Sequence, residues 1–211
     1  MFAIRYPHIF ATVGLHSGPV FGEARSAIGA MDVMRRGSRS DPITLIDAAL
    51  DVRDYPGMPA IIVHGELDSV VSATNAEQFA RQFLRLNGFV DAADDRRAGE
   101  THEDTQPDGV VTDHVKNSRR VVKTSVVRGL GHSRAGGDDT VAFHSSKGPD
   151  SSAVSCRNSS SIRNARTPPR RTRMLLESSA NANSGNFDCC NFAFISNVLR
   201  KRAEFILGIT L

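Results

Sequence analysis

Short apolar runs alternate with helical stretches over the first 150 residues of the chain. Residues 59–64 are the clearest strand, because a continuously apolar run suits a strand buried on both faces of a parallel sheet. Residues 11–15 and 121–127 predict two further strands. Between the second and third runs, residues 73–87 carry apolar side chains at helical spacing. A strand, a helix and a strand in this order predict a right-handed crossover, and therefore an α/β fold with a mainly parallel sheet and flanking helices.

The segments between these elements are less regular. Residues 19–57 are rich in Gly, Arg, Asp and Pro, and only residues 45–50 predict a helix there. Residues 90–119 are polar and charged without periodicity, which predicts a mobile excursion from the domain. The sequence of residues 1–6 is typical of the last part of a helix.

The composition of the chain changes after Asp150. Residues 151–191 form a low-complexity basic linker, dense in Ser, Asn and Arg, with too little apolar surface to order itself. Residues 192–211 are apolar again and predict an amphipathic helix, which either packs loosely on the domain or lies at a membrane interface. The sequence thus predicts an α/β domain over residues 1–150, a disordered linker and a C-terminal helix.

Length and charge narrow the classes of function. A chain of 211 residues is long enough for one domain with a sizeable core. Its net charge of +3 does not by itself indicate a nucleic-acid partner. The basic tail could bind phosphate backbones, but it lacks interleaved aromatic residues, so a solvated linker is favoured. A non-catalytic basic protein that binds nucleic acid or acidic surfaces through this tail remains the alternative. The oligomeric state is not indicated. The arginines concerned are Arg157, Arg163, Arg166, Arg170, Arg171 and Arg173.

Neither a disulfide framework nor a membrane span is predicted. The three cysteines, Cys156, Cys189 and Cys190, are odd in number and late in the chain, and two of them are adjacent. No apolar run approaches the roughly 20 residues of a transmembrane helix. The first residues show no basic region followed by an apolar core, so no signal peptide is visible.

Two polar residues follow the ends of neighbouring predicted strands. Asp68 comes just after the strand at residues 59–64, and His132 lies in the loop after the strand at residues 121–127. Loops beyond the carboxyl ends of parallel strands meet at one rim, so these two side chains can come together. A carboxylate that holds an imidazole through Nδ1 makes that imidazole a general base. The simpler alternatives are a helix-capping turn residue for Asp68 and a surface histidine for His132.

The other histidines do not predict a metal site. No pair has the i, i+4 spacing of a helical zinc site, and the cysteines lack a CxxC pair. Scattered core or surface histidines are the better interpretation, and no metal or cofactor is expected. The histidines considered are His64, His102, His114, His132 and His144.

Two serines could be considered as nucleophiles. Ser133 lies in Gly131-His132-Ser133-Arg134-Ala135, which nearly matches the Gly-x-Ser-x-Gly elbow, but the loop-like sequence after it predicts no helix. Ser17 follows a strand in His16-Ser17-Gly18 but lacks the first glycine of the elbow, so it is interpreted as a structural turn residue.

Three stretches in order resemble one family. They are AIRYPHIFATVGLHSG at residues 3–18, PAIIVHGELDSVV at residues 59–71 followed by Asn75, and VRGLGHSRAGGDDTVAFHSSKGPDSS at residues 127–152. Together they resemble the polyhydroxybutyrate depolymerase-like esterases, a branch of the α/β-hydrolases that includes feruloyl- and acetylxylan-type esterases. The resemblance covers roughly residues 1–155, and its motifs follow the order acid, then base, of that fold.

The resemblance implies a serine carboxylic-ester hydrolase. It implies that Asp68 is the acid of a catalytic triad and that His132 is its base, with an ester as substrate and an extracellular setting. In the family, the nucleophile elbow precedes the helix that leads into the equivalent of Arg5-Tyr6-Pro7. The elbow, the earlier strands and the oxyanion-hole loop would all lie upstream of Met1. The chain is therefore expected to be the C-terminal part of such an enzyme, with acid and base but no nucleophile, and inactive alone.

The sequence also departs from the family pattern. The family often has an aromatic residue two positions after the base, where this chain has Arg134. After Ser152 the family continues into a closing helix, whereas this chain becomes rich in Ser and Arg. We hypothesise that this tail arose by a reading-frame change or a mispredicted gene end, which the encoding DNA read in all frames would test.

Overall fold

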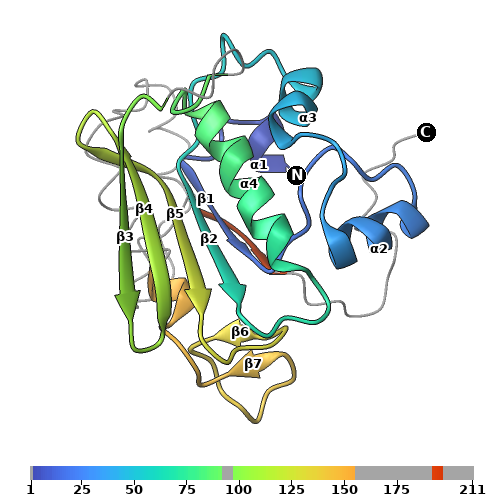
Figure 1. Ribbon diagram of the computed structural model, residues 1–211, viewed down its shortest axis with the longest axis vertical. Coiled ribbons are helices and arrows are strands. Elements are labelled where there is room, and N and C mark those ends of the chain that lie inside the picture. Colours follow the sequence, from blue (N-terminus) through green and yellow to red (C-terminus); the bar gives the residue numbers. More distant parts are fainter. Residues whose placement is uncertain (1, 92–96, 155–191, 197–211) are drawn as a thin grey trace, which may run out of the picture.

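A six-stranded, mostly parallel sheet forms the centre of the protein, with helices flanking it (Figure 1). The computed structural model describes residues 2–91, 97–154 and 192–196. The strand order is β3-β4-β5-β2-β1-β8, in which β5, β2, β1 and β8 are parallel neighbours. The predicted α/β class is confirmed. The strands are β1 (Thr12–His16), β2 (Ala60–Gly65), β3 (Glu100–Gln106), β4 (Gly109–Lys116), β5 (Arg119–Val127) and β8 (Phe192–Ser196).

Helices flank the sheet in the described part of the chain. α4 lies in front of the parallel strands in Figure 1 and packs on β2 and β5. It starts where the Ser72 hydroxyl accepts a hydrogen bond from the Thr74 N–H, and the chain leaves it through Gly88 at a φ of 60°. Its bounds agree with the helix predicted at residues 73–87. The helices are α1 (Phe2–Arg5), α2 (Ala27–Arg36), α3 (Pro42–Ala49) and α4 (Ala73–Leu86).

The core is divided by the sheet. On one face, side chains of α1, α3 and α4 pack on alternate residues of β1 and β2, with Phe83 at the centre and fully buried. On the other face, Ile61 and Val63 of β2 pack against Val127, Leu130 and Ala135, which belong to β5 and the chain beyond it. The segment that carries His132 is therefore fixed to the sheet by apolar contacts on both sides of that histidine.

The sequence predicts a mobile excursion at residues 90–119, but residues 100–116 of this range form two strands of the sheet. β3 and β4 form an antiparallel hairpin, and β4 also pairs antiparallel with β5. Every residue of β3 is exposed, so this edge strand shows no apolar alternation and its backbone pairing alone makes it a strand. The turn from β4 to β5 uses Asn117 and Ser118, both at positive φ, a conformation typical of tight hairpins.

The structure adds two features that the sequence analysis missed. α2 begins with the Ser26 hydroxyl accepting from the Gly29 N–H, and its last carbonyls receive hydrogen bonds from the buried Asn75 amide. The chain after β5 contains β6 (Arg134–Ala135), which pairs with β7 (His144–Ser145). Both lie near the arrowheads of the parallel strands in Figure 1.

The C-terminal part differs from the helix predicted at residues 192–211. Residues 192–196 form β8, which pairs in parallel with all five residues of β1, because an apolar aromatic segment meets an unpaired strand edge. Residues 197–211 lie outside the described part of the chain. So do residues 155–191, which hold most of the predicted linker, its arginines and the three cysteines. The start of that linker, residues 151–154, is a helical turn in which Ser151 is buried.

Within the described ranges, no helix is long and apolar enough to cross a membrane.

Candidate active site

Asp68 and His132 lie side by side at the carboxyl ends of β2 and β5. The distance between Asp68 Oδ2 and His132 Nδ1 is 2.9 Å. The carboxylate of Asp68 is fully buried and the imidazole of His132 is 12% exposed. The two residues are 64 positions apart in the chain, and the parallel pairing of β2 with β5 brings them to one rim. The structure therefore brings together the two residues that the sequence singled out.

The loop after β2 shapes the position of the carboxylate. The Asp68 N–H donates to the carbonyl of Gly65, and Asp68 Oδ1 accepts from the N–H groups of Val70 and Val71 at 2.9 Å each. This turn points the second oxygen, Oδ2, at the imidazole. Asp68 therefore also stabilises the turn, as the simpler interpretation of the sequence expected.

Backbone contacts join the loop after β2 to the loop after β5. Glu66 N–H donates to the carbonyl of Val127, and Leu67 N–H donates to that of Leu130, at 2.9 and 2.8 Å. The two chains run so close that a side-chain Cβ at Gly65 would lie 2.4 Å from the carbonyl oxygen of Gly131. A glycine at this position is therefore needed for His132 to approach Asp68.

The charge of Asp68 determines which nitrogen of His132 carries a proton. Burial alone would raise the pKa of Asp68, but hydrogen bonds from His132, Val71 and Ser17 outweigh it and lower the pKa to about 2. At neutral pH this carboxylate is ionised and accepts hydrogen bonds only. His132 therefore donates through Nδ1–H, and in the neutral ring Nε2 is the basic nitrogen.

His16, which the sequence analysis did not single out, lies beside this pair. It is the last residue of β1, is 3% exposed, and its Nε2 accepts a hydrogen bond from the Ala135 N–H at 3.2 Å. Burial, and next the neighbouring charge of His64, lower the pKa of His16 to about 4. The neutral ring is therefore the form that holds the segment after His132.

The lowered pKa of His16 predicts a loss of stability in mild acid. The unfolded chain protonates this histidine near pH 6.5 and the folded chain near pH 4, so the stabilisation is complete above pH 6.5 and decreases as the pH falls toward 4. The pKa difference corresponds to about 3 kcal/mol. Urea unfolding at a series of pH values should show that the free energy of unfolding decreases between pH 6.5 and pH 4. A folded His16→Gln variant should lack the part of this decrease that His16 causes. An equal slope in both proteins would contradict the assignment.

Neither candidate serine has the geometry of a nucleophile elbow. Ser133 is followed by β6 rather than by a helix, as the sequence analysis expected. Ser17 does have a φ of 48° at the end of a strand, but it is 2% exposed, its hydroxyl interacts with Asp68, and the next helix begins only at residue 27.

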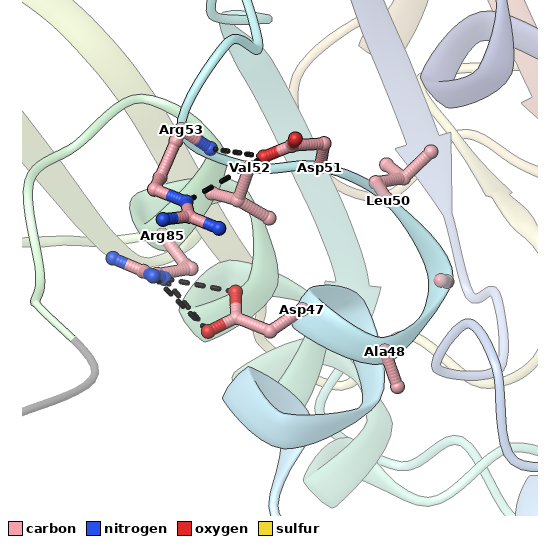
Figure 2. Close-up of a pocket in the computed structure, with 8 residues that line it drawn as sticks. Asp47, Ala48, Leu50, Asp51, Val52, Arg53 and Arg85 are labelled. Atoms are coloured by element: carbon pink, nitrogen blue, oxygen red, sulfur yellow. Dashed lines mark hydrogen bonds and ion pairs between the residues drawn. The ribbon is translucent and has the colours of Figure 1, made fainter.

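A separate cavity of about 540 Å³ lies between α3, the loop after it and the last turn of α4 (Figure 2). Arg85 and Asp47 form a bidentate ion pair in it, with nitrogen–oxygen distances of 2.9–3.3 Å. The lining loop precedes the amino end of β2, whereas Asp68 follows its carboxyl end. The cavity is therefore at the opposite end of the strands from the histidine–aspartate pair.

The remaining histidines lie on several different elements, and His64 lies near His16. His64 is buried on β2 and contacts the carbonyl of Val71 through Nε2 at 3.0 Å. His102 and His114 lie on the β3–β4 hairpin, and His144 lies on β7. In the described parts of the chain, no group of three or more His, Cys, Asp and Glu side chains could hold a metal ion.

Comparison with protein families gives a match over the first half of the chain. A family model described as Esterase PHB depolymerase matches residues 1–107. This range includes β1, β2, α4 and Asp68 and ends before His132. A search of curated proteins found no match.

Proposed function

Because the chain belongs to the esterase PHB depolymerase family, we propose that Asp68 and His132 are the acid and base of a serine carboxylic-ester hydrolase. The observation that carries this proposal is the 2.9 Å contact between Asp68 Oδ2 and His132 Nδ1 at the rim of parallel strands. A buried, ionised carboxylate that orients an imidazole is the arrangement that general-base catalysis needs.

The proposed reaction uses both nitrogens of His132. Nε2 takes the proton of a serine hydroxyl as the serine oxygen attacks the ester carbonyl, and Asp68 stabilises the imidazolium that forms. The same proton then passes to the leaving alcohol, which leaves an acyl-enzyme. A water molecule, deprotonated by His132, hydrolyses that acyl group and restores the serine.

We propose that the serine is not among the residues of this sequence. The sequence contains no Gly-x-Ser-x-Gly motif. Ser133 lacks the following helix that would supply backbone N–H groups, and Ser17 is buried against Asp68. The described chain thus offers the acid and the base of the triad but no suitable attacking group.

The chain alone is therefore expected to show no ester turnover above the buffer rate. The measurement is release of p-nitrophenol from p-nitrophenyl acetate and butyrate, with His132→Gln as the matched variant. Both proteins should give the same background rate. Turnover by the chain that His132→Gln abolishes would show that a nucleophile is present and would overturn this part of the proposal.

We also propose where the protein acts and where its catalytic domain ends. The family resemblance favours an extracellular enzyme whose catalytic domain takes up residues 1–150. The helical turn at residues 151–154 supports a boundary slightly later, since the Ser151 hydroxyl donates to the carbonyl of Ala135. Limited proteolysis with mass analysis of the surviving fragment would test where the domain ends.

A further inference from the structure

The last residue of β1 and the residue after it contact both members of the candidate pair. β1 is the parallel neighbour of β2, and the Ser17 N–H donates to the carbonyl of Val63 at 3.0 Å. This backbone contact fixes the end of β1 against the strand that leads to Asp68. His16 and Ser17 are both buried, so their polar groups face the protein interior.

Ser17 contacts the acid. Its buried hydroxyl interacts with the Asp68 carboxylate and helps to lower the pKa of that group. The same carboxylate accepts hydrogen bonds from the N–H groups of Val70 and Val71 and from the imidazole of His132. A φ of 48° is unusual for a residue with a side chain and is adopted only where the surroundings impose it. The strained backbone brings the Ser17 hydroxyl to the carboxylate.

His16 contacts the segment that carries the base. Its Nε2 accepts from the Ala135 N–H, three residues after His132, and the bond is buried. Since Nε2 is an acceptor here, the neutral ring carries its proton on Nδ1. The segment is also held by the Ser151 hydroxyl on the carbonyl of Ala135, so both backbone groups of Ala135 are bound.

We propose that His16 and Ser17 are positioning residues for the candidate pair: Ser17 orients the Asp68 carboxylate, and His16 holds the segment that carries His132. This inference rests on the proposed function. It assigns a role to a His-Ser-Gly motif that sequence analysis interprets as a turn. Neither residue exchanges a proton with the ester, so both act through Asp68 and His132.

The test is the protonation pattern of the His132 ring in the full chain. Long-range ¹H–¹⁵N spectra at pH 8 report which ring nitrogen carries the proton, and His132→Gln assigns the signal. The variants are His16→Leu and Ser17→Ala. Each is compared with a second substitution at the same position, His16→Gln or Ser17→Gly. Glycine favours the backbone conformation of residue 17 but has no hydroxyl. Glutamine retains an acceptor in place of the imidazole.

We expect His132 of the unaltered chain to be mainly in the Nδ1–H form, with a measurable minor population of the Nε2–H form. His16→Leu, Ser17→Ala and Ser17→Gly should each shift it toward a mixture, by about fivefold in the ratio of the two forms, the effect of one hydrogen bond. His16→Gln should restore much of the original ratio. Thr12→Val is the matched control, because it removes a buried hydroxyl hydrogen bond to Pro59 at the other end of β1.

An unchanged ratio in the three test variants would overturn the positioning role, and so would an equal shift in Thr12→Val, which would indicate a general loss of stability. The spectrum of the unaltered chain tests the proposed function separately. If His132 of the unaltered chain lacks the Nδ1–H form, the pair itself does not exist, and the proposed function fails with it.

Discussion

Replacing His132 by alanine in a form of the protein that includes a Gly-x-Ser-x-Gly serine is expected to lower kcat by about 10⁴- to 10⁶-fold. The loss is this large because the serine loses the group that accepts its proton. The measurement is hydrolysis of p-nitrophenyl butyrate by such a form. Reading the genomic sequence directly upstream of Met1 would show whether that form is encoded. The KM should change much less than kcat.

Asp68→Asn is the matched variant for the acid. An amide at this position keeps the shape of the side chain but no longer favours the Nδ1–H form of His132, and a loss of about 10⁴-fold is expected. His102→Ala, an exposed histidine on β3, should leave the rate unchanged. Full activity in the His132 variant would show that the catalytic base lies elsewhere.

Replacing Phe83 by alanine is expected to cost about 3–5 kcal/mol of folding free energy. The Phe83 side chain is fully buried between α4 and the sheet, with the ring of Phe79 at 6.2 Å, so the substitution leaves a large cavity. Domains of this size have a total stability of about 5–15 kcal/mol, so the variant should be close to unfolding. Urea unfolding followed by circular dichroism measures the difference.

Phe2→Ala is the control for this prediction. Phe2 is 71% exposed on α1, and its replacement should change the free energy by less than about 0.5 kcal/mol. If the two variants unfold at the same urea concentration, the helix-covered face of the sheet is not the main core.

The elements that can be predicted from the sequence are those in which buried positions follow a regular pattern along the chain. β2 and α4 were predictable because one is largely apolar and buried throughout, and the other is apolar on one face. β3 was not, because all its side chains face solvent and its pairing is carried by backbone groups that every residue has. α2 was missed for a related reason, since Val33 is its only buried residue.

The candidate site shows the same division. Asp68 and His132 could be proposed from sequence because each follows the end of a recognisable strand and belongs to a known motif. His16 could not, because its role depends on Ala135, a residue 119 positions away whose N–H looks like any other in the sequence. For Ser17, the presence of a turn was predictable, but its interaction with Asp68 depends on the relative position of two strand ends.

The place of β8 in the sheet has a consequence for biosynthesis. This strand comprises residues 192–196, yet it pairs with β1 at residues 12–16, which the ribosome makes much earlier. Until residues 192–196 have been made, the edge of β1 that β8 occupies can pair only with something else, such as a chaperone or a neighbouring nascent chain. A nonsense codon shortly before Phe192 would leave that edge exposed for the lifetime of the product.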